Sequence, residues 1–97
     1  MEHLKADLGT LQQGWTVVVT IDQRANVLLM DPHNYRIYAA GRGGEYRYFG
    51  GLAKRSPAKI PVPSTGQWYL AIDLAGRSGT IRHSVTIQSP PRGGLPT

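Results

Sequence analysis

Cysteine is absent from this chain of 97 residues. The absence excludes a disulfide scaffold, a thiolate nucleophile and a metal site built on cysteine, and it is typical of a reducing compartment. Long apolar runs are missing too: Val27 to Met30 is far shorter than the roughly 20 apolar residues that span a bilayer. The opening MEHLKADLGTLQQG has charges and no apolar core, so we do not expect a signal peptide. We therefore expect a cytoplasmic protein without a membrane partner.

Acidic side chains are scarce. Six Asp and Glu stand against eleven Lys and Arg, which gives a net charge of +5. Most of the cations are arginines, whose forked guanidinium suits phosphate and carboxylate groups. They are scattered along the chain, however, and a dispersed positive charge promotes solubility as readily as it promotes binding.

Apolar residues that are present recur with a period of two, which is typical of β-strands half-buried on one face. The two clearest strands carry Val17, Val19 and Ile21 on one, and Trp68, Leu70 and Ile72 on the other, all predicted to face the core. Tyr69, Ala71 and Asp73 are predicted to face outward. Strands are predicted at 3–8, 15–22, 27–31, 45–49, 58–62, 68–74 and 80–87.

A helical signal interrupts this pattern near 32–40. Asp31 is a capping residue before Pro32, Gly41 stands where a helix would end, and Tyr35 and Tyr38 lie three residues apart on one side. So short a helix needs Tyr35 and Tyr38 to pack on a sheet. About seven short strands and one helical turn predict an all-β fold, a compact, mostly antiparallel β-sandwich or jelly-roll-like barrel. Residues 1–88 are expected to form one domain, followed by a flexible Pro/Gly-rich tail at 89–97.

The run YRYFGGLAKRSPAKIPVPSTGQWYLAIDL, followed by GTIRHSVTI, resembles the small bacterial proteins of domain-of-unknown-function family 1883. The similarity extends from HLKADLG near the N-terminus to about Ile87. The resemblance implies a compact, mostly antiparallel β-sandwich of bacterial origin, joined in some longer chains to signalling domains such as TIR. It implies no activity.

The stretch YRYFGGLAKR, residues 46–55, combines three aromatic and three cationic side chains. On a strand, Tyr46 and Tyr48 would share a face and form a platform for single-stranded nucleic acid, with the loop cations beside it. The alternative is that these tyrosines pack on the core while the cations are solvated. We favour packing, with Tyr46 and Tyr48 largely buried. The candidate ligand-binding residues are Arg42, Arg47, Tyr48, Lys54, Arg55 and His83.

His83 shares a face with Ile81, Val85 and Ile87 on the last predicted strand, so a hydrogen-bonded core histidine is favoured over a ligand or catalytic group. His3 and His33 show no metal-ligand spacing with it, and we expect no metal and no cofactor. No serine lies in a nucleophile elbow, and no glycine-rich loop has phosphate-loop spacing.

These features predict a non-enzymatic module that binds a small ligand or a protein. The first alternative is a binder of nucleic acid or of an anionic small ligand through the basic, aromatic loop, and the second is a hydrolase-like enzyme around His83. The protein is expected to be a monomer or a weak homo-oligomer.

Overall fold

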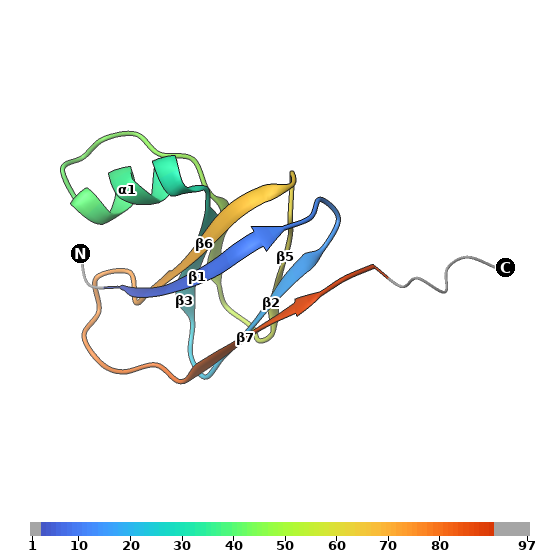
Figure 1. The fold of residues 1–97 in the computed structure, drawn as a ribbon. Coiled ribbons are helices and arrows are strands. Elements are labelled where there is room, and N and C mark those ends of the chain that lie inside the picture. Colours follow the sequence, from blue (N-terminus) through green and yellow to red (C-terminus); the bar gives the residue numbers. More distant parts are fainter. Residues whose placement is uncertain (1–2, 91–97) are drawn as a thin grey trace, which may run out of the picture.

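A computed structural model describes residues 3–90, which form two antiparallel sheets packed face to face (Figure 1). The four-stranded sheet has the order β1 (Leu4–Leu11), β6 (Gly66–Asp73), β3 (Ala25–Met30) and β4 (Phe49–Ala53). The three-stranded sheet has the order β5 (Ala58–Pro61), β2 (Thr16–Ile21) and β7 (His83–Gln88). The predicted mostly antiparallel β-sandwich is confirmed.

The core fills the space between the two sheets. All six residues of strand β2 are β-branched, which suits a pleated, buried surface, and β6 contributes large side chains from the opposite sheet. The alternating pattern therefore identified the buried faces correctly. All six residues predicted to be buried there are so: Val17, Val19, Ile21, Trp68, Leu70 and Ile72.

Helix α1 (Pro32–Ala40) begins and ends as predicted. The Asp31 carboxylate accepts a hydrogen bond from the backbone N–H of Asn34 at 2.8 Å, and Pro32 occupies the first turn. Gly41 ends the helix in the left-handed conformation, with φ at 64°. Local sequence signals thus fix both ends of this short helix.

Replacing Asp31 with Ala should lower the free energy of unfolding by about 0.5–2 kcal/mol, because a helix N-terminal donor loses its acceptor. Urea denaturation would measure the loss. Asp31→Asn, which keeps an acceptor oxygen, should retain most of the stability. Equal losses in both variants would contradict a capping role.

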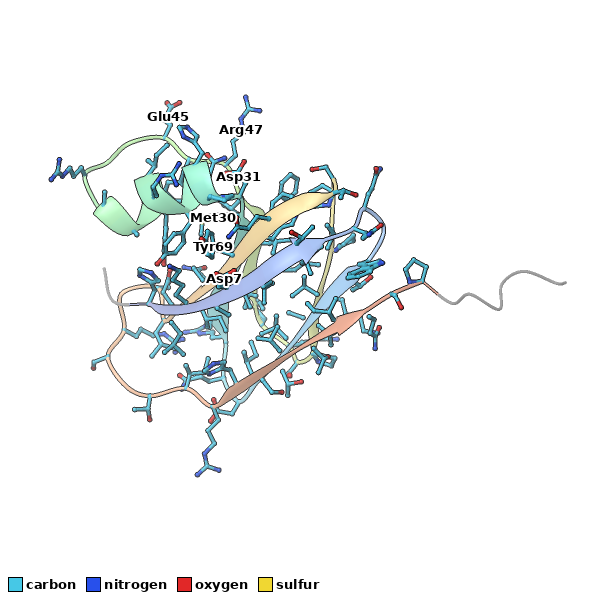
Figure 2. The ribbon with its side chains drawn as sticks, viewed as in Figure 1. Asp7, Met30, Asp31, Glu45, Arg47 and Tyr69 are labelled. Carbon is cyan, nitrogen blue, oxygen red and sulfur yellow. The ribbon has the colours of Figure 1, made fainter. Side chains whose placement is uncertain are left out.

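The outer face of the four-stranded sheet is covered by α1. Ala71 and Asp73, predicted to face outward, do point away from the main core, yet both are buried beneath the helix. Tyr38 of α1 packs there on Leu28 and Met30 of β3 in a second apolar cluster. Figure 2 shows Met30 and Tyr69 between the helix and the sheet. The expectation that tyrosines hold the helix on a sheet is confirmed.

The strand predicted at 45–49 is wrong in its bounds. Residues 45–48 lie outside the sheets, and β4 begins only at Phe49 and continues through Gly50 and Gly51. Both glycines have a ladder partner on β3. Strands β1 and β7 also differ from their predicted ranges, by starting or ending one to three residues later.

The predicted tail at 89–97 falls mainly on residues 91–97, which lie outside the described residues. Within residues 3–90, no helix has the length and apolar character needed to cross a membrane.

Candidate functional site

A buried carboxylate marks the end of β6. Asp73 is 4% exposed and accepts three hydrogen bonds. Its Oδ1 atom accepts from Asn26 Nδ2 at 2.9 Å and from the backbone N–H of Ala75 at 2.8 Å, while Oδ2 accepts from the Tyr38 hydroxyl at 2.6 Å. Asn26 is the register partner of Asp73 on β3, and Tyr38 comes from α1. One side chain therefore ties two strands, a turn and the helix together.

The hydrogen bond between Tyr38 and Asp73 changes the acidity of the phenol. Burial raises the pKa of Tyr38 well above its ordinary value of 10.0. The Asp73 carboxylate raises this pKa further, because it accepts a hydrogen bond from the Tyr38 hydroxyl and because its negative charge disfavours a phenolate. Tyr38 therefore keeps its proton in the folded protein at a pH where an exposed tyrosine ionises.

This shift predicts a loss of stability in alkali. The folded-state pKa of Tyr38 is higher than the unfolded one, so its contribution to stability is complete below about pH 10 and is lost as pH rises above that value. The free energy of unfolding in urea should fall more steeply above about pH 10 in the wild type than in Tyr38→Phe. Tyr48→Phe, which changes an exposed tyrosine, should follow the wild-type slope. Identical slopes in all three proteins would contradict the shift.

All five tyrosines of the chain form one continuous cluster on this face. Ring centroids are 5.2 Å apart for Tyr69 and Tyr35, 6.3 Å for Tyr35 and Tyr38, 5.4 Å for Tyr38 and Tyr46, and 6.0 Å for Tyr46 and Tyr48. Such pairs add about 0.5–1.5 kcal/mol each beyond their burial. The cluster extends the packing of α1 to the segment before β4.

Two cationic or ionisable side chains of the N-terminal segment border this tyrosine cluster. The His3 ring lies 4.9 Å from Tyr38 between centroids, and its Nε2 atom shares a 2.8 Å hydrogen bond with the Tyr35 hydroxyl. The Lys5 ammonium lies over two rings, 4.9 Å from the centroid of Tyr35 and 4.7 Å from that of Tyr69. The start of β1 is thereby held against the helix.

A hollow of about 890 Å³ lies next to this cluster, between the start of β1 and the loop that joins β6 to β7. We call it the 74–81 hollow. Apolar side chains of β1, β6 and the loop line part of it, and polar groups line the rest. The residues around it are His3, Leu4, Ile72, Asp73, Leu74, Gly76, Arg77, Ser78, Gly79, Thr80 and Ile81.

The loop that forms this hollow is held by hydrogen bonds from side chains to backbone carbonyls. Arg77 donates from Nε to the carbonyl of Leu74 at 3.1 Å and from its terminal Nη2 to the carbonyl of Arg24. The Gln23 side chain donates to the carbonyl of Thr80 at 2.6 Å. These bonds connect the loop at two points to the turn between β2 and β3, so the wall of the hollow is anchored.

A second hollow, of about 430 Å³, lies between β4 and β5. We call it the β4–β5 groove. Three cations border it, and none of its lining residues is acidic. The lining residues are Val27, Gly50, Gly51, Leu52, Ala53, Lys54, Arg55, Ala58, Lys59 and Ile60.

The structure separates the predicted binding residues into groups. Lys54 and Arg55 lie together at the β4–β5 groove. Arg47 precedes β4 at its other end, where its backbone N–H donates to the Asn34 side chain. Figure 2 shows Arg47 pointing away from the sheet beside α1. Arg42 comes after Gly41, which ends the helix, and is exposed. A single grip made from all the predicted cations is therefore not formed.

Two burial predictions are wrong. Tyr48 is 47% exposed and Tyr46 is only half-buried, because their segment lies outside the sheet and contacts the helix instead. His83 is exposed at the first position of β7, opposite Ile21, whereas a core histidine was favoured. Strand β7 is an edge strand, and its inward-facing side chains at Val85 and Ile87 are only partly covered.

Sequence reasoning missed the role of Asp73, which was predicted to face outward. Its position at the end of an otherwise apolar strand was the available signal, since a carboxylate there needs donors if the strand end is covered. Within residues 3–90, no group of three His, Asp or Glu side chains is placed to hold a metal ion.

Comparison with known proteins places the chain in one family. The family model described as "Domain of unknown function (DUF1883)" matches residues 1–91. No curated protein and no solved structure matches the chain.

Proposed function

Because the chain belongs to the DUF1883 family, whose function is unknown, we propose from its geometry that it is a non-enzymatic module that binds a small organic ligand in the 74–81 hollow. The observation that carries this proposal is the hollow itself. Its volume of about 890 Å³ lies within the roughly 300–1,000 Å³ of small-molecule sites.

The lining favours a partly apolar ligand. Leu4 is 40% exposed although it is a large apolar residue on a strand, and it borders the hollow together with Leu74 and Ile81. A ligand that covers Leu4 would remove this apolar surface from water, which stabilises a complex by about 25 cal/mol per Å². Ser78 and Thr80 add hydroxyl groups that donate and accept hydrogen bonds.

The state of Asp73 supports binding over catalysis. Its carboxylate is the acidic group that borders the hollow, and its oxygens are held by three internal donors. A general base needs hydrogen-bond reach to a substrate proton. Asp73 is placed instead to fix the position of the loop through the N–H of Ala75.

The test uses 8-anilinonaphthalene-1-sulfonate, whose apolar rings and sulfonate suit the lining of the hollow. Its fluorescence should rise saturably with the wild type. Thr80→Trp should weaken binding about tenfold or more, because an indole occupies the space. Thr86→Trp, on the exposed face of β7, is the matched control and should bind as the wild type does. Equal binding by both variants would overturn the proposed site.

A second candidate function is the binding of an anionic partner at the β4–β5 groove. It is favoured by one observation, the gathering of Lys54, Arg55 and Lys59 around a groove with no acidic lining residue. Affinity for a polyanion such as an oligonucleotide should then fall linearly with the logarithm of salt concentration. A salt-independent affinity would argue against it.

A further inference from the structure

Strand β4 is an edge strand of the four-stranded sheet, paired on one side only within residues 3–90. Among the described residues it hydrogen-bonds with β3 alone, and it lies at the end of the strand order. An edge strand presents backbone N–H and C=O groups that another extended chain can pair with. The opposite wall of the β4–β5 groove is β5, which is itself an edge strand of the second sheet.

The backbone of β4 is accessible from the groove because two of its five residues, Gly50 and Gly51, have no side chain. Apolar side chains stand beside these glycines. Leu52 is 52% exposed and Phe49 is 44% exposed, although both belong to a strand. A strand laid along β4 would cover these apolar groups while it pairs with the backbone.

The charge of the groove selects the sequence of such a strand. Lys54 and Arg55 follow β4 directly, and Lys59 is an exposed residue of β5 on the other wall. Carboxylates on an entering segment would meet cations from both sides, whereas a basic segment would be repelled.

These features point to a peptide rather than a nucleic acid. A single-strand platform needs exposed aromatic rings among its cations. None of the described residues that line the β4–β5 groove with these cations is aromatic. The exposed rings of Tyr48 and Phe49 lie before the lined part of β4, where Tyr48 contacts Tyr46 and the Phe49 ring is in edge contact with Trp68, 5.9 Å between centroids. We propose that the β4–β5 groove binds an acidic, extended segment of a partner protein, which adds a strand to the edge of β4. The inference rests on the second candidate function and specifies its partner.

The test measures binding of a fluorescein-labelled peptide of alternating Glu and Val, about eight residues long, enough to span β4 and reach the cations. Fluorescence anisotropy should show saturable binding. The same peptide with alternate backbone nitrogens methylated should not bind, since it cannot form a ladder. In 15N NMR spectra, the amide signals of Gly50 and Gly51 should shift when the unmodified peptide is added.

Charge variants locate the contact. Lys54→Ala with Arg55→Ala and Lys59→Ala should weaken peptide binding about tenfold or more. The free energy of unfolding of this triple variant should differ from that of the wild type by only about 0–1 kcal/mol, since exposed charges contribute little to folding. The matched control removes three exposed cations near the helix, Arg36→Ala with Arg42→Ala and Arg47→Ala, and should bind the peptide as the wild type does.

Three outcomes would overturn the inference, and they are distinguishable. Tighter binding of an oligothymidylate of equal charge, lost in the groove variant, would keep the anion-binding function but replace the peptide with nucleic acid. Equal binding of the methylated peptide would exclude strand addition. If neither probe binds, the anion-binding function fails as well, and the cations only protect the strand edge from aggregation.

Discussion

Gly50→Ala should be among the most destabilising single substitutions in this domain. A Cβ atom at Gly50 would lie nearer to the backbone oxygen of Val27 than the 3.0 Å that real Cβ contacts essentially never undercut, and 2.9 Å from Ile60 Cδ1. The backbone there has a φ of 104°, which side-chain-bearing residues rarely adopt. Strain and overpacking together should cost on the order of 3–5 kcal/mol. A small domain has about 5–15 kcal/mol in total, so the variant would be close to unfolding.

The neighbouring glycine provides the control for this prediction. Gly51 also has a positive φ, at 137°, but a Cβ atom there would meet nothing within 4 Å. Gly51→Ala should therefore show the conformational strain alone, about 1–3 kcal/mol. The midpoints of urea denaturation for the two variants measure the steric part by difference. If Gly50→Ala is as stable as Gly51→Ala, the close approach of β4 to β3 is not as described.

The sandwich and its core were predictable because the physical signal is local and repeated. Alternation in β2 and β6 fixes which side chains face inward, whichever strands become their neighbours. The helix was predictable for a similar reason, since Asp31, Pro32 and Gly41 act within one turn of their own positions. The predicted family was also correct, and it is confirmed over residues 1–91.

Strand β4 could not be placed from its own residues. Gly50 and Gly51 have low strand propensity, and the aromatic residues just before them fit the strand pattern better. The strand forms where β3 offers a ladder partner and where the absence of a side chain lets the backbones approach, as at Gly50. Burial of Tyr48 was mispredicted as a consequence of that displacement.

The 74–81 hollow could not be predicted because its residues come from segments that are far apart in the sequence. His3, Asp73 and Thr80 meet at the 74–81 hollow only after β1 has paired with β6 and the β6–β7 loop has closed around it. Lys54 and Lys59 are close in sequence, so their gathering could be anticipated. The separation of Arg42 from them depends on where α1 packs, which the alternation of strands does not encode.

The links that Asp73 makes between these segments lead to the second large effect. Asp73→Ala should cost on the order of 3–5 kcal/mol, because three donors lose their acceptor and the Tyr38 hydroxyl is buried. Asp73→Asn preserves the shape but places an NH₂ group where one oxygen accepted, so it should recover only part of the loss. Urea denaturation at neutral pH measures both.

A double-mutant cycle shows whether Tyr38 and Asp73 act as a pair. Tyr38→Phe alone should cost about 1.5–3 kcal/mol, the range for a hydrogen bond to a charged group. In the Asp73→Ala background the same change should cost far less, since the hydroxyl has already lost its acceptor, and a coupling of about 1–3 kcal/mol should result. Additive losses would show that the 2.6 Å contact contributes nothing of its own to stability. With coupling present, Asp73 links the helix to the loop of the 74–81 hollow, and Asp73→Asn should then weaken 8-anilinonaphthalene-1-sulfonate binding although the probe need not touch the carboxylate.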